Sequence, residues 1–255
     1  MPAKELVISA ASWLVVAVLP GCSAGAPAGG SPPPTPGPSA DAALAFTVAG
    51  VHPVLPNGSQ DTHPHTPKAG CDGATLAADQ ALGVRVADGF ALAGFPASAR
   101  LLRHFLNGKG TQVNYRTGSL ISKKVLASSA FRAVNNEVQD AILRQLKAGR
   151  TRLRLSAGQL PAVAFQSRNS DLYWAFRGTQ GLSVTGNGRR ENGRYAGTLS
   201  YVIRDSYGFP AEDTLAGLGA PMRYLQTVCG APQHAGGAHW FPDTITVTVP
   251  FNRPA

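Results

Sequence analysis

An acidic stretch late in the chain carries the side chains with the clearest chemical potential. Residues 201–209, YVIRDSYGF, have Tyr, Ile, Asp, Tyr and Phe at every second position, and Asp213 follows shortly after them. Such alternation predicts an extended strand whose successive side chains point to opposite faces. Asp205 and Tyr207 then share a face with apolar side chains. A carboxylate in that position needs a hydrogen-bond donor, a cation or water, so Asp205 is a candidate site residue.

Two further groups could complete an acid–base site with Asp205 and Tyr207. They are Asp213 and His239, the latter in AHWFPD before the last predicted strand. Carboxylates and imidazoles are the usual proton acceptors in enzymatic hydrolysis. The alternatives are a strand that runs into a solvated turn at Asp213, and a His239 that packs in a hydrophobic loop. The sequence leaves these alternatives open.

The elements that must position these side chains fall into two groups along the chain. Helices come first: one begins near Pro96 and ends near residues 107–108, and a longer one is capped by Ser128 or Ser129 and ends at Gly149. Beyond Gly149 the pattern has period two, with a hairpin expected in GNGRRENGRY. Helices followed by strands predict an α+β fold in which the helices pack on an antiparallel β-sheet.

Four short motifs follow one another in a fixed order. They are HFLNGKG at 104–110, RGTQGLSVTGNG at 177–188, NGRYAGTLSY at 192–201 and RDSYGF at 204–209. This order resembles the catalytic domain of colicin M and related bacteriocins, which cleave the lipid-linked peptidoglycan precursor. The resemblance spans roughly residues 99–213. It implies a colicin M-like half-barrel and Mg²⁺-dependent phosphodiesterase chemistry.

The resemblance places Asp205 and Tyr207 at the family's first Asp and its Tyr, with Asp213 and His239 as possible further members of the site. Gly208 stands where the family has its second Asp, and PAEDTLAG replaces a His-Arg pair. Glycine supplies neither a metal ligand nor a proton acceptor. We therefore expect a non-catalytic binding or interaction domain without a metal or cofactor. The alternatives are a Mg²⁺-dependent phosphodiesterase acting on polyprenyl-linked wall precursors, and a secreted structural domain.

The N-terminal sequence indicates export. An apolar run from Leu6 to Leu19 is shorter than the roughly 20 residues that span a membrane, and it has the length of a secretory signal. The run ends in LPGC, which resembles a bacterial lipoprotein signal with lipidation at Cys22. Plain secretion with a chance cysteine is the alternative. Lipidation would place the protein on the extracytoplasmic face of the cell membrane.

These signals divide the chain into four segments. We expect a signal peptide at 1–21, a lipid anchor with a Pro/Gly-rich linker at 22–42, a loop-rich segment at 43–73 and the α+β domain at 74–255. In the oxidising surroundings of an exported protein, Cys71 and Cys229 are expected to pair. The alternatives are two free thiols and a metal site with His63 and His65.

The composition and the net charge narrow the classes of partner that the protein is expected to bind. The net charge is +9 with 15% charged residues, and the sequence contains no phosphate-binding Gly-rich loop, His-Glu metal helix or Gly-x-Ser-x-Gly elbow. The expected partners are the membrane, through Cys22, and an anionic envelope ligand rather than nucleic acid. Cations cluster around residues 144–154, where they could complement a helix end or face anionic lipid head groups.

Overall fold

The computed structural model describes residues 44–52, 70–176, 179–209, 217–230 and 237–255. The described helices are α1 Gly73–Leu92, α2 Pro96–Leu106, α3 Leu120–Ala127, α4 Ser129–Lys147, α5 Asp171–Phe176 and α6 Gly219–Thr227, with a 3₁₀ turn at Ala157–Gln159. The described strands are β1 Ala45–His52, β2 Val113–Tyr115, β3 Arg152–Leu155, β4 Gly181–Glu191, β5 Arg194–Tyr207 and β6 Phe241–Pro254. The α+β prediction is confirmed, but α5 and α6 lie beyond Gly149, where the sequence pattern predicted only strands.

The six strands form one sheet in the order β2-β6-β5-β4-β1-β3. The pairs β1–β4, β4–β5 and β5–β6 are antiparallel, as expected, but β1–β3 and β2–β6 are parallel, so the sheet is mixed. In both parallel pairs, helices lie between the two strands along the chain. Such long crossover connections allow β2 and β3 to join the edges of the sheet in parallel orientation. The sheet includes β1, which lies within the stretch assigned from the sequence to the loop-rich segment 43–73.

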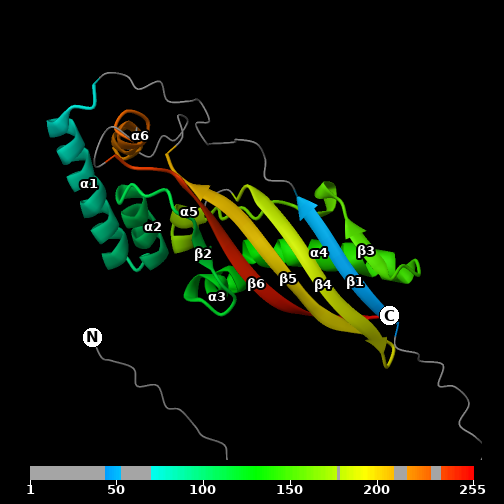
Figure 1. The fold of residues 1–255 in the computed structure, drawn as a ribbon. Coiled ribbons are helices and arrows are strands. Elements are labelled where there is room, and N and C mark those ends of the chain that lie inside the picture. The colour runs from blue at the N-terminus through cyan, green and yellow to red at the C-terminus, as the bar shows by residue number, and fades with distance from the viewer. Residues whose placement is uncertain (1–43, 53–69, 177–178, 210–216, 231–236) are drawn as a thin grey trace, which may run out of the picture. The chain divides into compact units, whose positions relative to one another are not determined.

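A tight hairpin fixes the register of the two longest strands. Asn192 and Gly193 connect β4 to β5 with φ values of 50° and 70°, as a type I′ turn requires. The register of β5 on β6 then runs from Arg194 opposite Pro254 to Tyr207 opposite Phe241. These two strands carry the candidate site at the end that is remote from the hairpin (Figure 1).

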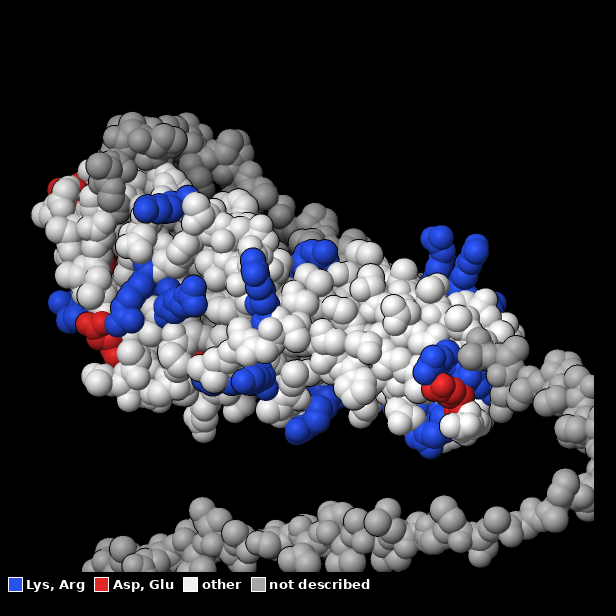
Figure 2. Space-filling model, turned by 60° about the horizontal axis from the view of Figure 1, so that its bottom comes forward, with Lys and Arg blue, Asp and Glu red and all other residues white. Residues whose placement is uncertain are grey.

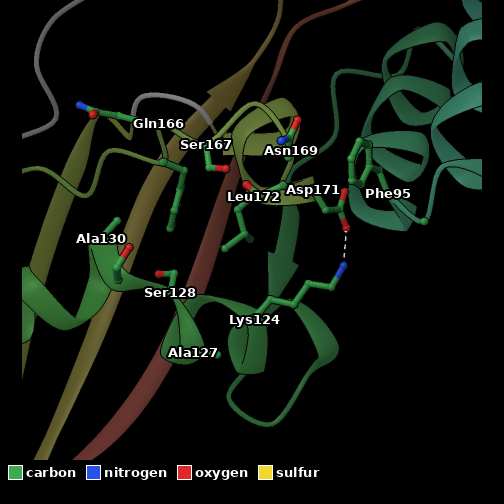
Figure 3. A pocket seen from close by; sticks show the side chains of 14 residues that line it. Phe95, Lys124, Ala127, Ser128, Ala130, Gln166, Ser167, Asn169, Asp171 and Leu172 are labelled. Atoms are coloured by element: carbon green, nitrogen blue, oxygen red, sulfur yellow. Dashed lines mark hydrogen bonds and ion pairs between the residues drawn. The ribbon is translucent and has the colours of Figure 1, made fainter. Parts of the chain in front are cut away.

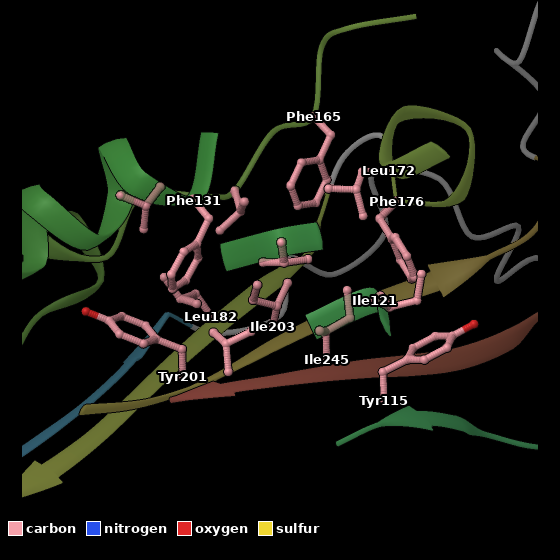
Figure 4. Close-up of a cluster of buried hydrophobic side chains, with 14 of the residues drawn as sticks. Tyr115, Ile121, Phe131, Phe165, Leu172, Phe176, Leu182, Tyr201, Ile203 and Ile245 are labelled. Carbon is pink, nitrogen blue, oxygen red and sulfur yellow. The ribbon is translucent and has the colours of Figure 1, made fainter. Parts of the chain in front are cut away.

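Helix α4 covers one half of the sheet. The apolar stripe of this helix is buried, and it consists of Phe131, Val134, Val138, Ala141, Ile142 and Leu146. The Ser128 side chain caps the helix by accepting a hydrogen bond from the Phe131 N–H. The Phe131 ring meets the Tyr201 ring edge-on, with centroids 5.3 Å apart. Figure 4 shows these two rings within a cluster of buried hydrophobic side chains between the helices and the strands. Burial of this stripe, rather than helix propensity, holds α4 on the sheet.

The other helices gather at the site end of the sheet, around β2 and β6 (Figure 1). The predicted bridge between Cys71 and Cys229 is confirmed, and it ties the segment before α1 to the end of α6. Tyr224 reinforces this junction, since its hydroxyl donates to the Gly70 carbonyl and accepts from the Asp72 N–H. Residues 63 and 65 lie outside the described part. In that part, no helix combines the length and apolarity needed to cross a membrane.

Candidate functional site

The predicted face of β5 is confirmed. Tyr201, Ile203 and Tyr207 are buried on the side of the sheet that the helices cover, with exposed fractions of 0, 1 and 8%. Strand alternation puts Asp205 on this same side, where it is half-buried. A carboxyl group therefore lies among core side chains and keeps some contact with solvent.

A second carboxyl group lies directly opposite. In the register of β5 on β6, Asp205 faces Asp243, which is only 1% exposed. Opposed side chains on antiparallel strands have Cβ atoms about 5 Å apart, so the two acids meet on one face. Both carboxyl oxygens of Asp243 are buried without a hydrogen-bond partner among the described residues. Unsatisfied buried carboxyl oxygens are costly, and they mark this position as a site.

The surroundings keep protons on these acids. Burial raises the pKa of Asp205 to about 8, although the Ser206 backbone N–H acts in the opposite direction. Burial and then the charge of Asp205 raise the pKa of Asp243 well above its usual range. Two like charges in low-dielectric surroundings cannot both form cheaply. Without a cation, the pair holds at least one proton at neutral pH.

Tyr115 on the neighbouring strand β2 adds an unsatisfied hydroxyl. In β2 it stands two positions after Val113, which pairs with Asp243, and its buried Oη has no hydrogen-bond partner among the described residues. Burial raises its pKa to about 12, against the effect of the Arg100 guanidinium, whose Cζ lies 5.7 Å from the ring centroid. The charge of Asp243 contributes to the same rise. Unsatisfied polar atoms thus gather around Asp243.

Tyr207, a predicted site residue, belongs to an aromatic cluster beside the pair. Its ring stacks on Phe241 at 5.5 Å and meets the rings of Phe105 and Phe209 edge-on, at 6.2 and 6.0 Å. The hydroxyl group is not needed for these contacts. The structure therefore gives Tyr207 a packing role in the wall next to Asp205.

The structure does not bring His239 to the pair. Gly108 and Gly110, in the turn after α2, approach its side chain closely enough that an added Cβ would lie 3.7 and 3.5 Å from it. No hydrogen bond or ion pair of the described residues joins His239 to Asp205 or Asp243. Asp213 lies outside the described residues.

His104, in the first of the colicin-like motifs, is engaged elsewhere. Its Nε2 lies 2.8 Å from the Thr111 carbonyl oxygen and 3.2 Å from the Thr111 hydroxyl. Its ring also packs edge-on against Phe241, with centroids 4.4 Å apart. These contacts hold the end of α2 against β6, so the structure assigns His104 a packing role.

Close packing explains why position 208 is a glycine. An added Cβ would lie 2.9 Å from Gln226 Oε1 and 3.1 Å from the Trp240 Cβ. Gln226 Oε1 also accepts a hydrogen bond of 3.0 Å from the Phe209 N–H. The space that an aspartate would need at position 208 is therefore taken by the side chain of α6.

A pocket of about 490 Å³ lies near the N-terminus of α4 (Figure 3). Lys124 and Asp171 both line it and form an ion pair, with Nζ 2.7 Å from Oδ2. The Asp171 carboxylate, 4% exposed, also accepts hydrogen bonds from the N–H groups of Ala97 and Ser98 at the start of α2. Burial tends to raise the pKa of Asp171, but Lys124 and these donors outweigh it and lower the pKa. This carboxylate is fully partnered and joins α2, α3 and α5.

Sequence reasoning missed Asp243. The signal was present, because Phe241, Asp243 and Ile245 alternate on β6 as Ile203, Asp205 and Tyr207 do on β5. What the sequence lacked was the pairing of the two strands. Chemically, the pair can share a proton as an acid–base couple or offer oxygen ligands to a divalent cation. The described residues contain no group of three or more His, Cys, Asp or Glu that could hold a metal.

Comparison of the chain with known proteins gave no match among family models, curated proteins or solved structures.

Proposed function

We propose that this chain is an extracytoplasmic protein anchored to the cell membrane through lipidated Cys22. Its domain binds an anionic ligand of the cell envelope through a divalent cation held between Asp205 and Asp243. The observation that carries this proposal is the Asp243 carboxyl group, which is buried, unsatisfied and opposed to a second carboxyl. A cation would satisfy both acids at once.

The donor chemistry fits such a cation. Mg²⁺ and Ca²⁺ prefer oxygen ligands, and Mg²⁺ is commonly held by one or two carboxylates, with the remaining positions filled by water and by the ligand's own oxygens. Asp205 and Asp243 supply two carboxylates, and Asp205 is half-buried rather than enclosed. The phosphate or carboxylate oxygens of an envelope polymer would complete the coordination. A net charge of +9 also favours an anionic partner.

Binding without turnover is supported by the neighbours of the pair. In general acid–base hydrolysis the proton donor or acceptor is most often a His side chain. His104 is bonded to Thr111, and His239 packs against the turn after α2. The pair thus has acidic ligands, but no imidazole of the described residues contacts it.

A second candidate function is Mg²⁺-dependent phosphodiester cleavage of polyprenyl-linked wall precursors. One observation favours it: Asp243 supplies from β6 the second carboxylate that Gly208 cannot. Asp205 and Asp243 would hold the ion, which would polarise a phosphoryl oxygen when bound. Asp213 and His239 would be the remaining sources of proton transfer.

Thermal unfolding with and without cation tests the binding site. We expect 1 mM Mg²⁺ or Ca²⁺ to raise the Tm of the full chain at pH 8 by several degrees, because a ligand that binds only the folded state stabilises it. Asp243→Asn should abolish the shift. Glu137→Gln, which removes an exposed carboxylate on α4, is the matched control and should keep it. No shift in the parent chain at millimolar cation would reject the cation site.

Turnover separates the two candidates. Polyprenyl-linked precursor is incubated with the chain and Mg²⁺, and release of the headgroup is measured. We expect no release from the parent chain or from Asp205→Asn. Metal-dependent release by the parent that is lost in Asp205→Asn would establish the phosphodiesterase.

Membrane fractionation tests the anchor separately from the site. Cys22→Ser should move the protein from the membrane fraction to the soluble fraction. A variant that fractionates like the parent would show that Cys22 does not anchor the chain.

A further inference from the structure

One end of the domain is strongly basic. The β4–β5 hairpin, the start of β3, the C-terminal end of α4 and the last residues of β6 all meet there (Figure 1). The Tyr195 hydroxyl on β5 donates to the Leu146 carbonyl at the end of α4, which fixes this neighbourhood. The cationic residues of this basic end are Arg144, Lys147, Arg150, Arg152, Arg189, Arg190, Arg194 and Arg253.

Few acids offset this charge. Glu191 pairs with Arg189 at 2.9 Å, and Asp140 pairs with Arg253 at 3.4 Å. Within the described ranges, no ion pair engages the other cations of the basic end. All of these cations except the half-buried Arg253 are exposed. Figure 2 shows lysines and arginines crowded at this end of the molecule, with a small acidic spot among them.

The described chain also begins at this end. The Leu44 carbonyl accepts a hydrogen bond from the Arg190 N–H, and Ala45 pairs with Arg189 across β1 and β4. The chain between Cys22 and Leu44 has 44 − 22 = 22 steps, which reach at most about 75 Å. A tether from Cys22 would therefore join the domain at the basic end.

We propose that the basic end docks on an anionic lipid surface, with its arginines and Lys147 against the head groups. The proposal rests on lipidation at Cys22, which would keep the domain close to the membrane. The positive charge of the basic end would then make the contact with the head groups. Each Lys or Arg near an anionic membrane surface strengthens binding by about 5-fold, so several together act as a second anchor. One acyl attachment and one basic surface then hold the domain in a fixed orientation.

Vesicle binding without the acyl chain tests this contact alone. The full chain carrying Cys22→Ser is sedimented with vesicles of phosphatidylcholine containing 0 or about 30% phosphatidylglycerol. We expect binding only to the anionic vesicles, weakening as salt is raised. Adding Arg150→Gln and Arg190→Gln should lower the affinity by about 25-fold, which is about 5-fold for each residue.

A matched control separates position from total charge. Arg85→Gln with Lys109→Gln removes the same two charges from exposed sites on α1 and after α2. This variant should bind the anionic vesicles like its parent. Equal loss in both double variants, no loss in the basic-end variant, or tighter binding to a DNA duplex than to the vesicles at the same salt would overturn the proposal. The result is independent of cation binding at Asp243 and of fractionation of the Cys22→Ser chain in cells.

Discussion

Asp205 on β5 and Asp243 on β6 are opposed across an antiparallel strand pair and share the helix-covered face of the sheet. Their neighbours along the two strands are Ile203, Tyr207, Phe241 and Ile245. Apolar and aromatic surroundings favour the neutral acids over the carboxylates. Ionisation of the pair therefore destabilises the folded state, and a bound proton or cation would remove this destabilisation.

The stability of the domain should depend on pH through this pair. The folded-state pKa values of Asp205 and Asp243 are raised, whereas an unfolded Asp titrates near 4. The folded state therefore binds more protons, and the free energy of unfolding should fall as the pH rises from about 4 towards 8. Urea unfolding at pH 4, 6 and 8 in chelator measures this. Asp243→Asn should flatten the dependence and stabilise the domain at pH 8, by on the order of 1 kcal/mol for each pKa unit of proton uptake that it removes. An unchanged slope would refute this prediction.

The contribution of Asp171 to stability should depend on pH in the opposite direction, because it should be lost at low pH. Asp171 accepts hydrogen bonds from the start of α2 and from Lys124, and its pKa is lowered. Asp171→Asn should cost about 2–3 kcal/mol at pH 7, because an amide cannot accept all of these donors. Its contribution is present above about pH 4 and is lost as the pH falls through the lowered folded-state pKa. Lys124→Met leaves the α2 donors in place and should cost less; the reverse order in urea unfolding would contradict this assignment.

Removing the disulfide should destabilise the junction of α1 and α6. The bridge between Cys71 and Cys229 closes a sequence separation of 158 residues, for which the chain-entropy model gives at most roughly 5 kcal/mol. Denaturant unfolding with and without reductant measures the loss. Tyr224→Phe should cost about 1–2 kcal/mol more, because Gly70 and Asp72 lose their hydrogen bonds to it. Insensitivity to reductant would mean that the bridge carries no stability.

Introducing an aspartate at position 208, where the resemblance to colicin M expects one, should not create a catalytic site. Gly208→Asp would push against Gln226 and Trp240 and displace the hydrogen bond from the Phe209 N–H. We expect a loss of about 1–3 kcal/mol and no gain of precursor cleavage. Gly208→Ala is the control for size, and it should cost less. A stable Gly208→Asp variant that cleaves the precursor would show that the packing has room for the acid.

The sequence predicted the local structure better than the site. The helix cap near Ser128, the hairpin within GNGRRENGRY and the apolar-facing side for Asp205 were predicted, because each depends on neighbouring residues. The parallel addition of β2 and β3 was not, because it depends on contacts between distant segments. The partner of Asp205 was missed for the same reason, since Asp243 is 38 positions away (243 − 205) and only the strand register joins them.

The length of β5 has a consequence for what the acid pair can touch. Arg194 lies in the basic end and Asp205 lies 205 − 194 = 11 positions along the same strand, which is roughly 35 Å at about 3.3 Å per residue. If the basic end rests on lipid and β5 stands along the membrane normal, the strand is a spacer that holds the carboxylates well above the head groups of that membrane. A diphosphate at the surface of the same leaflet would then be out of reach, whereas polymers in the space above would not. The sheet itself would thus select its ligands by their height above the bilayer.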